Sequence, residues 1–118
     1  QSTGETVSAS GASAANMLGL STQNPTRQVY WTSGPSRHLK LGAQSVELHH
    51  VPNWQLRAPQ SKAGHALRAM AYYGKSEAKQ LLHRLKSHLN EEERIELFAL
   101  RVGTPTWLAK ELSALAAA

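Results

Sequence analysis

The sequence predicts an α+β domain, in which a small antiparallel sheet of three to four strands with a short N-terminal helix precedes about four helices. Up to about residue 51, apolar and β-branched residues alternate along short segments, whereas from Ser61 they recur at the helical spacing of three and four. A length of 118 residues suits a single domain. We expect a sheet half at about 5–51 and a helical half at about 61–117.

The stretch Ser10–Pro25 predicts a short uncharged helix and a turn, packed against the sheet. Ser10 can cap the helix, and Gly19 can adopt the left-handed conformation that ends one. The apolar side of this helix would consist of Ala14, Ala15 and Leu18. Before it, Thr6–Ser8 could form a short strand.

Three segments after Pro25 have the composition of strands, namely Gln28–Thr32, His38–Leu41 and Val46–Val51. Turn residues separate them, including a tight turn at Gly42–Ala43. This succession predicts an antiparallel meander. A loop holding Trp54 and Arg57 should follow, between Pro52 and Pro59.

Four helices are predicted from Ser61 onward. The first covers Lys62–Tyr73 and is closed by Gly74. The second starts near a cap at Ser76 and buries Ala78, Leu81, Leu82, Leu85 and Leu89. The third begins after a cap at Asn90 with three glutamates in its first turn, and Ile95, Phe98 and Val102 should face the core. The last starts at Thr104–Pro105 and buries Trp107, Leu108, Leu112 and Leu115.

Composition argues against catalysis. Cysteine and aspartate are both absent, which removes thiol chemistry and paired-aspartate magnesium sites. The adjacent residues His49 and His50 should point to opposite faces of a strand, so they do not suit one metal ion. We therefore expect no enzyme, no catalytic residue, no cofactor and no metal.

No apolar run approaches the roughly 18 residues of a membrane span. With no cysteine and no signal peptide in the sequence, we expect a cytoplasmic protein without a membrane partner. The first residue is Gln1, so we expect the natural start to lie upstream.

Positive charge is concentrated in the middle of the chain. Residues 27–86 hold ten lysines and arginines against two glutamates, while both flanking segments are slightly acidic. Such a basic segment suggests a surface for nucleic acid or another polyanion. The residues expected to form this basic face are Arg37, Lys40, Arg68, Lys75, Lys79 and Arg84. Trp54, Tyr72 and Tyr73 could add stacking or could simply pack in the core.

A family resemblance begins in the same stretch that predicts the first helix. The residues that carry it are Ser10-Gly11, Ala14-Ala15-Asn16 and Leu18-Gly-Leu-Ser-Thr-Gln23, followed by Gly34-Pro-Ser-Arg37. In these segments the chain resembles the AbiEi-like antitoxins of type IV (abortive infection) toxin-antitoxin systems. The similarity covers about residues 8–117 and ends with Gly103-Thr-Pro-Thr-Trp107. Two places depart from the family pattern, the residue after Gly42 and the segment Trp54–Gln60.

The resemblance implies a bacterial, non-enzymatic regulator with two parts. An N-terminal winged helix would bind operator DNA, and a C-terminal domain would counter a nucleotidyltransferase-like toxin without needing a stable complex with it. This chain corresponds to the C-terminal domain, and we expect the winged helix to be absent from it. The alternative is a dimerisation or protein-interaction module of a DNA-binding repressor, using the exposed edge of the sheet. The sequence leaves the oligomeric state open.

Overall fold

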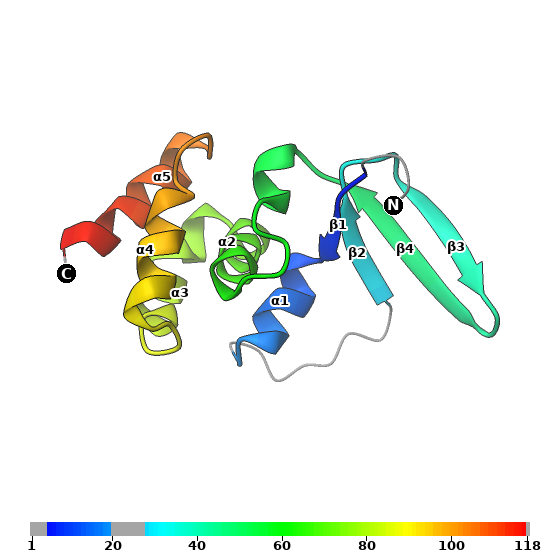
Figure 1. Cartoon of the computed structure of the whole chain (residues 1–118), viewed down its shortest axis with the longest axis horizontal. Coiled ribbons are helices and arrows are strands. Elements are labelled where there is room, and N and C mark those ends of the chain that lie inside the picture. The colour runs from blue at the N-terminus through cyan, green and yellow to red at the C-terminus, as the bar shows by residue number, and fades with distance from the viewer. Residues whose placement is uncertain (1–4, 20–27, 118) are drawn as a thin grey trace.

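The computed structural model describes residues 5–19 and 28–117, and it confirms an α+β fold with a small sheet (Figure 1). The strands are β1 (Val7–Ala9), β2 (Gln28–Thr32), β3 (Arg37–Leu41) and β4 (Gln44–His50). The helices are α1 (Gly11–Met17), α2 (Lys62–Tyr73), α3 (Lys75–Leu85), α4 (Glu91–Ala99) and α5 (Thr106–Ser113). Two 3₁₀ turns are added, η1 (Asn53–Leu56) and η2 (Ala114–Ala117).

The sheet is mixed, with strand order β1-β2-β4-β3. β1 pairs with β2 and β3 pairs with β4 in antiparallel fashion, but β2 and β4 are parallel. The predicted antiparallel meander is therefore wrong, because β4 and not β3 lies beside β2. The hairpin of β3 and β4 does form, around Gly42 with φ +65°.

Hydrogen bonds to His50 explain why β2 and β3 are not neighbours. The link between them, residues 33–36, passes the end of β4 and is held there by His50. The His50 ring lies 2.9 Å from the Gly34 carbonyl, and its backbone N–H donates to the Ser36 hydroxyl at 2.8 Å. This path crosses two interstrand spacings, which is roughly 10 Å in total, and four residues can span that distance.

Helix α1 packs chiefly against α2, whereas the prediction was packing against the sheet. Ser10 caps it by accepting from the backbone N–H of Ser13, and Gly19 follows the helix with φ +77°. A Cβ on Gly11 would lie 2.3 Å from the Cβ of Tyr72 and 2.6 Å from the Arg68 carbonyl oxygen. The start of α1 thus rests directly on the backbone of α2. The turn expected at residues 20–25 lies outside the described residues.

Helix α2 is the central element of the molecule. It contacts α1, α3, α4 and η1, and Figure 1 shows it between the sheet with α1 on one side and α3 to α5 on the other. Apolar residues of all five α-helices contribute to one buried cluster, in which Leu67, Leu85, Leu97, Leu108 and Leu112 have no exposed surface. The core therefore lies among the helices.

Gly74 joins α2 directly to α3. It ends α2 and precedes Lys75 with φ +87° and ψ −179°, a conformation nearly confined to glycine. The predicted cap at Ser76 is wrong, because the cap position is Gly74, two residues earlier, and no side chain caps the helix. The stripe Ala78, Leu81, Leu82 and Leu85 is buried as predicted, and Leu89 is buried just beyond the helix.

Helix α4 begins with the predicted capping box, in which Asn90 and Glu93 each accept from the other's backbone N–H at 2.8 Å. Its buried side differs from the prediction. Leu97 is fully buried and Phe98 partly so, whereas Ile95 and Val102 are exposed. Two residues correspond to about 200° around a helix, so burial of Leu97 turns Ile95 to solvent. Val102 follows the end of the helix.

Helix α5 starts at Thr106 after Pro105, one residue later than predicted, with Leu108, Leu112 and the following Leu115 buried. Trp107 is only partly buried. Thr104 does not cap the helix, since its hydroxyl donates to the Arg101 carbonyl. No helix within 5–19 and 28–117 is long and apolar enough to cross a membrane.

Candidate partner-binding surface

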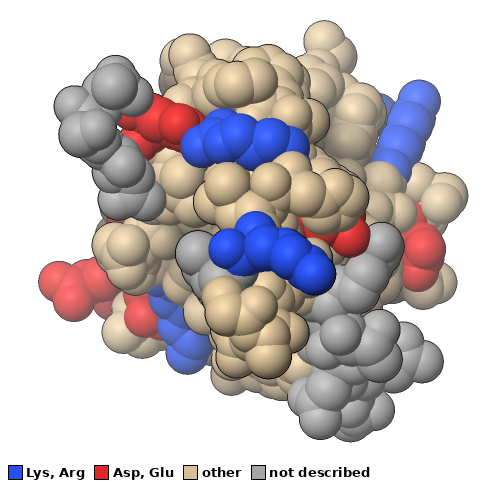
Figure 2. All heavy atoms as spheres, turned by 90° about the vertical axis from the view of Figure 1, so that its right-hand side faces the viewer, with Lys and Arg blue, Asp and Glu red and all other residues tan. Residues whose placement is uncertain are grey.

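The six residues of the predicted basic face do not share one side of the molecule. Arg37 and Lys40 belong to β3, in the hairpin at one end of the 48 Å long axis, while Lys75, Lys79 and Arg84 belong to α3 in the other half (Figure 1). Figure 2 shows the hairpin end, where basic side chains stand apart with uncharged surface between them. A single continuous basic face is therefore not formed.

Arg68 is not on the surface at all, because its side chain on α2 is fully buried. Its guanidinium donates to the backbone carbonyls of Gln55 (3.4 Å), Arg57 (3.3 Å) and Pro59 (3.2 Å). Burial lowers the pKa of Arg68 to about 10, so the group remains protonated at neutral pH. Arg68 is a structural cation that holds the loop around η1, and it cannot contact a partner.

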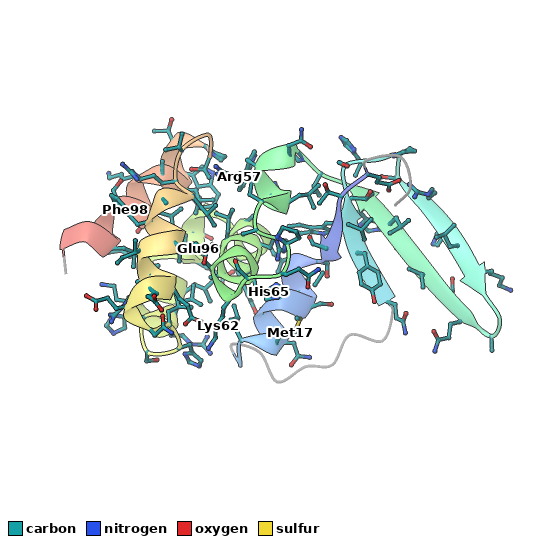
Figure 3. The ribbon with its side chains drawn as sticks, in the orientation of Figure 1. Met17, Arg57, Lys62, His65, Glu96 and Phe98 are labelled. Atoms are coloured by element: carbon teal, nitrogen blue, oxygen red, sulfur yellow. The ribbon has the colours of Figure 1, made fainter. Side chains whose placement is uncertain are left out.

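Two neighbours complete this internal cluster. His65 Nδ1 lies 2.8 Å from an Arg68 nitrogen, and burial together with the Arg68 charge lowers the pKa of His65. Arg57 extends from the loop to donate to the Leu100 carbonyl at the end of α4, and Figure 3 shows this side chain between η1 and α4. These contacts join the loop to two helices, which is a structural role.

Arg37 is engaged within the sheet half. Its guanidinium donates to both Glu5 oxygens, at 2.9 and 3.1 Å, and to the Pro35 carbonyl at 2.8 Å. Glu5 also accepts from the Thr32 hydroxyl, at the end of β2. The Thr32 and Arg37 hydrogen bonds lower the pKa of the Glu5 carboxyl below its ordinary value of 4.5. The pair fixes residues before β1 against β2 and β3.

Glu5→Gln should therefore reduce stability in a pH-dependent way. A lowered folded-state pKa contributes stability that is fully present above pH 4.5 and is lost as the pH falls through the folded-state value. Urea denaturation from pH 7 to pH 3 should show a difference between wild type and variant that shrinks below pH 4.5. A difference that stays constant over this range would contradict the proposed ion pair.

Lys75 and Lys79 are brought together on one side of α3. At 100° per residue, four residues fall within an arc of about 80° beside the buried stripe, namely Lys75, Lys79, His83 and Lys86. We call these four residues the basic strip. Lys75, Lys79 and His83 are exposed and Lys86 is half-buried. Arg84 lies about 140° around the helix from Lys79, next to Glu77, and so belongs to another side.

Helix stability accounts for only part of the basic strip. Lys75 is the first residue of α3, where the helix dipole disfavours a cation. His83 and Lys86 at the other end are favourably placed, so the dipole explains only half of the strip. The unfavourable position of Lys75 makes this residue a candidate for binding.

A groove of about 450 Å³ opens at Lys75, between the start of α3 and α5. Its lining consists of Lys75, Thr106, Trp107, Lys110 and Glu111. Both helices begin here without a side-chain cap, so their first N–H groups and two ammonium groups make the local field positive. The groove can accept an anionic ligand, with one aromatic side chain and one carboxylate to orient it.

Sequence reasoning missed this groove. The sequence predicts a last helix that buries Trp107, and nothing local in the sequence indicates that α5 packs beside Lys75. The available signal was the absence of a good cap before either helix, since Gly74 and Pro105 have no side-chain acceptor. Uncapped helix starts with a nearby lysine are compatible with anion binding.

The hairpin contains a second polar group that the sequence did not indicate. His38 Nε2 and His49 Nε2 lie 3.5 and 2.9 Å from the two oxygens of Glu47. His50 makes its contacts at Gly34 and Ser36 instead, in agreement with opposite faces for His49 and His50. Across the described part of the chain, no three histidine or acidic side chains are arranged to hold a metal ion.

The aromatic residues considered for stacking have structural contacts. The rings of Tyr72 and Tyr73 meet edge to face at 5.4 Å, and Trp54 and Tyr73 pack against the core. Tyr72 is 55% exposed. These three side chains do not line the groove, where Trp107 is the aromatic group.

The fold and surface thus define a small α+β domain with a basic strip on one helix and a groove lined by two lysines, a tryptophan, a threonine and a glutamate. A protein-family model matches residues 4–97, and the chain belongs to that family, DUF6088, a family of unknown function. Neither the comparison with curated proteins nor the comparison with solved structures finds a match. The matched span includes α3 but ends before α5, so it covers the basic strip and only one side of the groove.

Proposed function

We propose that this chain is a non-enzymatic antitoxin or transcriptional-regulator domain that acts in the cytoplasm of a bacterium by binding through α3. The observation that carries the proposal is the basic strip, which joins three lysines and a histidine on one side of a helix. Its ligand would be nucleic acid, such as operator DNA, or another polyanion. The functional partner would be a nucleotidyltransferase-like toxin, as the resemblance to AbiEi-like antitoxins implies.

Charge and burial support α3 over the other basic residues. Arg68 is buried and Arg37 is paired with Glu5, so neither offers a charge for a phosphate. Lys75 and Lys79 are exposed one turn apart, at a spacing of about 6 Å along the axis, which is close to two steps of roughly 3.4 Å between the charges of one strand. The strip can therefore follow a nucleic-acid backbone.

Reversing two charges of the strip should weaken binding to a polyanion. Lys75→Glu combined with Lys79→Glu should weaken binding to duplex DNA about tenfold or more at low salt, and should flatten the dependence of affinity on salt. Fluorescence anisotropy at two salt concentrations measures both. In cells, the same variant should fail to rescue growth from the toxin encoded beside it.

A matched control changes the net charge equally at another place. Lys40→Glu combined with Lys62→Glu alters two exposed lysines on β3 and α2, outside the strip. This variant should retain rescue and most of the DNA affinity. Equal losses in both double variants would mean that net charge alone matters, and full rescue by the α3 variant would remove the strip from the mechanism.

A dimerisation or protein-interaction module is the second candidate, favoured by the exposed edge of the sheet. β3 is an edge strand, and Leu39 on β3 and Tyr30 on β2 are each 38% exposed. However, His38 and Lys40 on the same edge would approach their copies in a symmetric strand pair, and edge lysines oppose such pairing. This favours α3 as the binding element.

Sedimentation with and without duplex DNA separates the two candidates. A species that sediments as a monomer and shifts with DNA at low salt supports binding through α3. A stable dimer that is indifferent to DNA supports the edge of the sheet, and Leu39→Lys should then return it to the monomer. Such a dimer would overturn the first candidate.

A further inference from the structure

We propose that the groove between α3 and α5 binds one nucleotide, with the base against Trp107 and the phosphate between Lys75 and Lys110. The inference rests on the proposed function only through Lys75, which belongs to both the strip and the groove. Its ligand could be a free mononucleotide or the terminal nucleotide of a strand, since both present the same base and phosphate.

The size of the groove suits a small ligand. Its volume of about 450 Å³ falls within the range of roughly 300–1,000 Å³ that is usual for small-molecule sites. A continuous duplex would lie across such an opening, whereas a mononucleotide can enter it. The strip and the groove therefore differ in what they can hold, although they adjoin at Lys75.

The lining residues match the parts of a nucleotide. Lys75 and Lys110 are exposed lysines on different helices, and together they outnumber the single carboxylate of Glu111. Two ammonium groups around one opening favour a phosphate, which carries one to two negative charges. Glu111 disfavours a ligand that is anionic throughout, so it is expected near an uncharged, hydrogen-bond-donating part, such as a base amino group.

Trp107 distinguishes a nucleotide from a simple anion. Its indole is partly buried against the core, which fixes the ring, and part of its surface lines the groove. Stacking of a base on a fixed aromatic ring adds to the affinity and tolerates any base. Thr106, at the start of α5, adds a hydroxyl beside the ring.

The test is a titration of the whole chain with adenosine monophosphate, inorganic phosphate and adenosine, followed by NMR of the labelled protein. Adenosine monophosphate should shift the indole N–H signal of Trp107, which Trp107→Phe identifies among the three tryptophans. Lys110→Glu should weaken this binding about tenfold. A missing shift at Trp107, or equal binding of phosphate and adenosine monophosphate, would overturn the nucleotide assignment.

Two variants make failure of this inference distinct from failure of the proposed function. Lys110 lies in the groove but outside the strip, and Lys79 lies in the strip but does not line the groove. Lys79→Glu should leave the affinity for adenosine monophosphate within about twofold while weakening binding to duplex DNA. If Lys79→Glu leaves duplex binding unchanged and Lys110→Glu still weakens nucleotide binding about tenfold, the groove stands and the strip does not.

A single-stranded oligonucleotide with or without a 5′-phosphate separates the two sources of the ligand. A terminal nucleotide is the natural occupant if the phosphorylated strand binds better and Lys110→Glu removes the difference. A free mononucleotide is the occupant if the two strands bind equally while adenosine monophosphate still shifts Trp107. If no nucleotide, free or terminal, perturbs Trp107, the inference is wrong.

Discussion

Gly64→Ala is expected to lower the melting temperature by about 10 °C, which corresponds to about 3 kcal/mol of unfolding free energy. Alanine normally favours a helix interior by roughly 1 kcal/mol over glycine, and on that ground alone the variant would gain stability. At Gly64, however, the new Cβ would lie 1.9 Å from the backbone carbonyl oxygen of Ala58 and 2.9 Å from that of Arg57. The steric effect should exceed the propensity effect.

The backbone in this region cannot easily move away. The segment 57–59 is held by the hydrogen bonds that Arg68 donates to Arg57 and Pro59, and Ala58 already has a left-handed φ of +51°. Gly64 itself donates to the Ser61 cap at 3.0 Å. Relieving the clash would therefore disturb the loop or the start of α2.

Gly42→Ala is the matched control, because it adds the same methyl group where nothing lies within 4 Å. It should cost about 1 kcal/mol, from the left-handed φ of the hairpin turn alone. Thermal unfolding followed by circular dichroism compares the two variants. If Gly64→Ala is no less stable than Gly42→Ala, the result would contradict the close contact between the loop backbone and Gly64 on α2.

Arg68→Ala should lower the free energy of unfolding by about 4 kcal/mol. The substitution leaves three carbonyl oxygens without their donor and creates a cavity beside α2. Removing a buried charge returns part of its desolvation cost, which limits the loss. Urea denaturation measures the change, and faster amide hydrogen exchange in residues 53–61 should accompany it.

Arg68→Met separates packing from hydrogen bonding. Methionine fills much of the same volume without donors, so the expected loss is about half, roughly 2 kcal/mol, and exchange in the loop should still be faster. Lys79→Ala on the exposed side of α3 should change stability by less than about 0.5 kcal/mol. Wild-type stability in Arg68→Met would contradict a role for Arg68 in anchoring the loop.

Much of the fold could be predicted from local chemistry. The bounds of α2, the cap at Ser10 and the capping box at Asn90 depend on residues a few positions apart, and all three predictions are confirmed. The sheet order could not be predicted in this way. Three alternating segments fit a meander and the observed order equally well, and the difference depends on hydrogen bonds between His50 and the link before β3.

Arg68 shows why the candidate site was only partly predicted. Its position opposite the apolar stripe of α2 indicates solvent if a helix has one buried side. α2 is instead covered by α1, α3, α4 and η1, so Arg68 is internal whereas Lys62 remains exposed. The run of small residues around α2 was a usable signal, because alanine and glycine are among the residues most often fully buried. The groove depends on the packing of α3 and α5, which no local pattern encodes.

The backbone conformation of Gly74 couples binding to folding. All four residues of the strip follow Gly74, and its φ and ψ set the direction in which α3 leaves α2. A substitution there meets no neighbouring atom within 4 Å, but the φ of +87° strains any other residue. A screen for loss of rescue should therefore recover position 74, an uncharged residue, together with Lys75 and Lys79, and only the variants at position 74 should also lower the protein level.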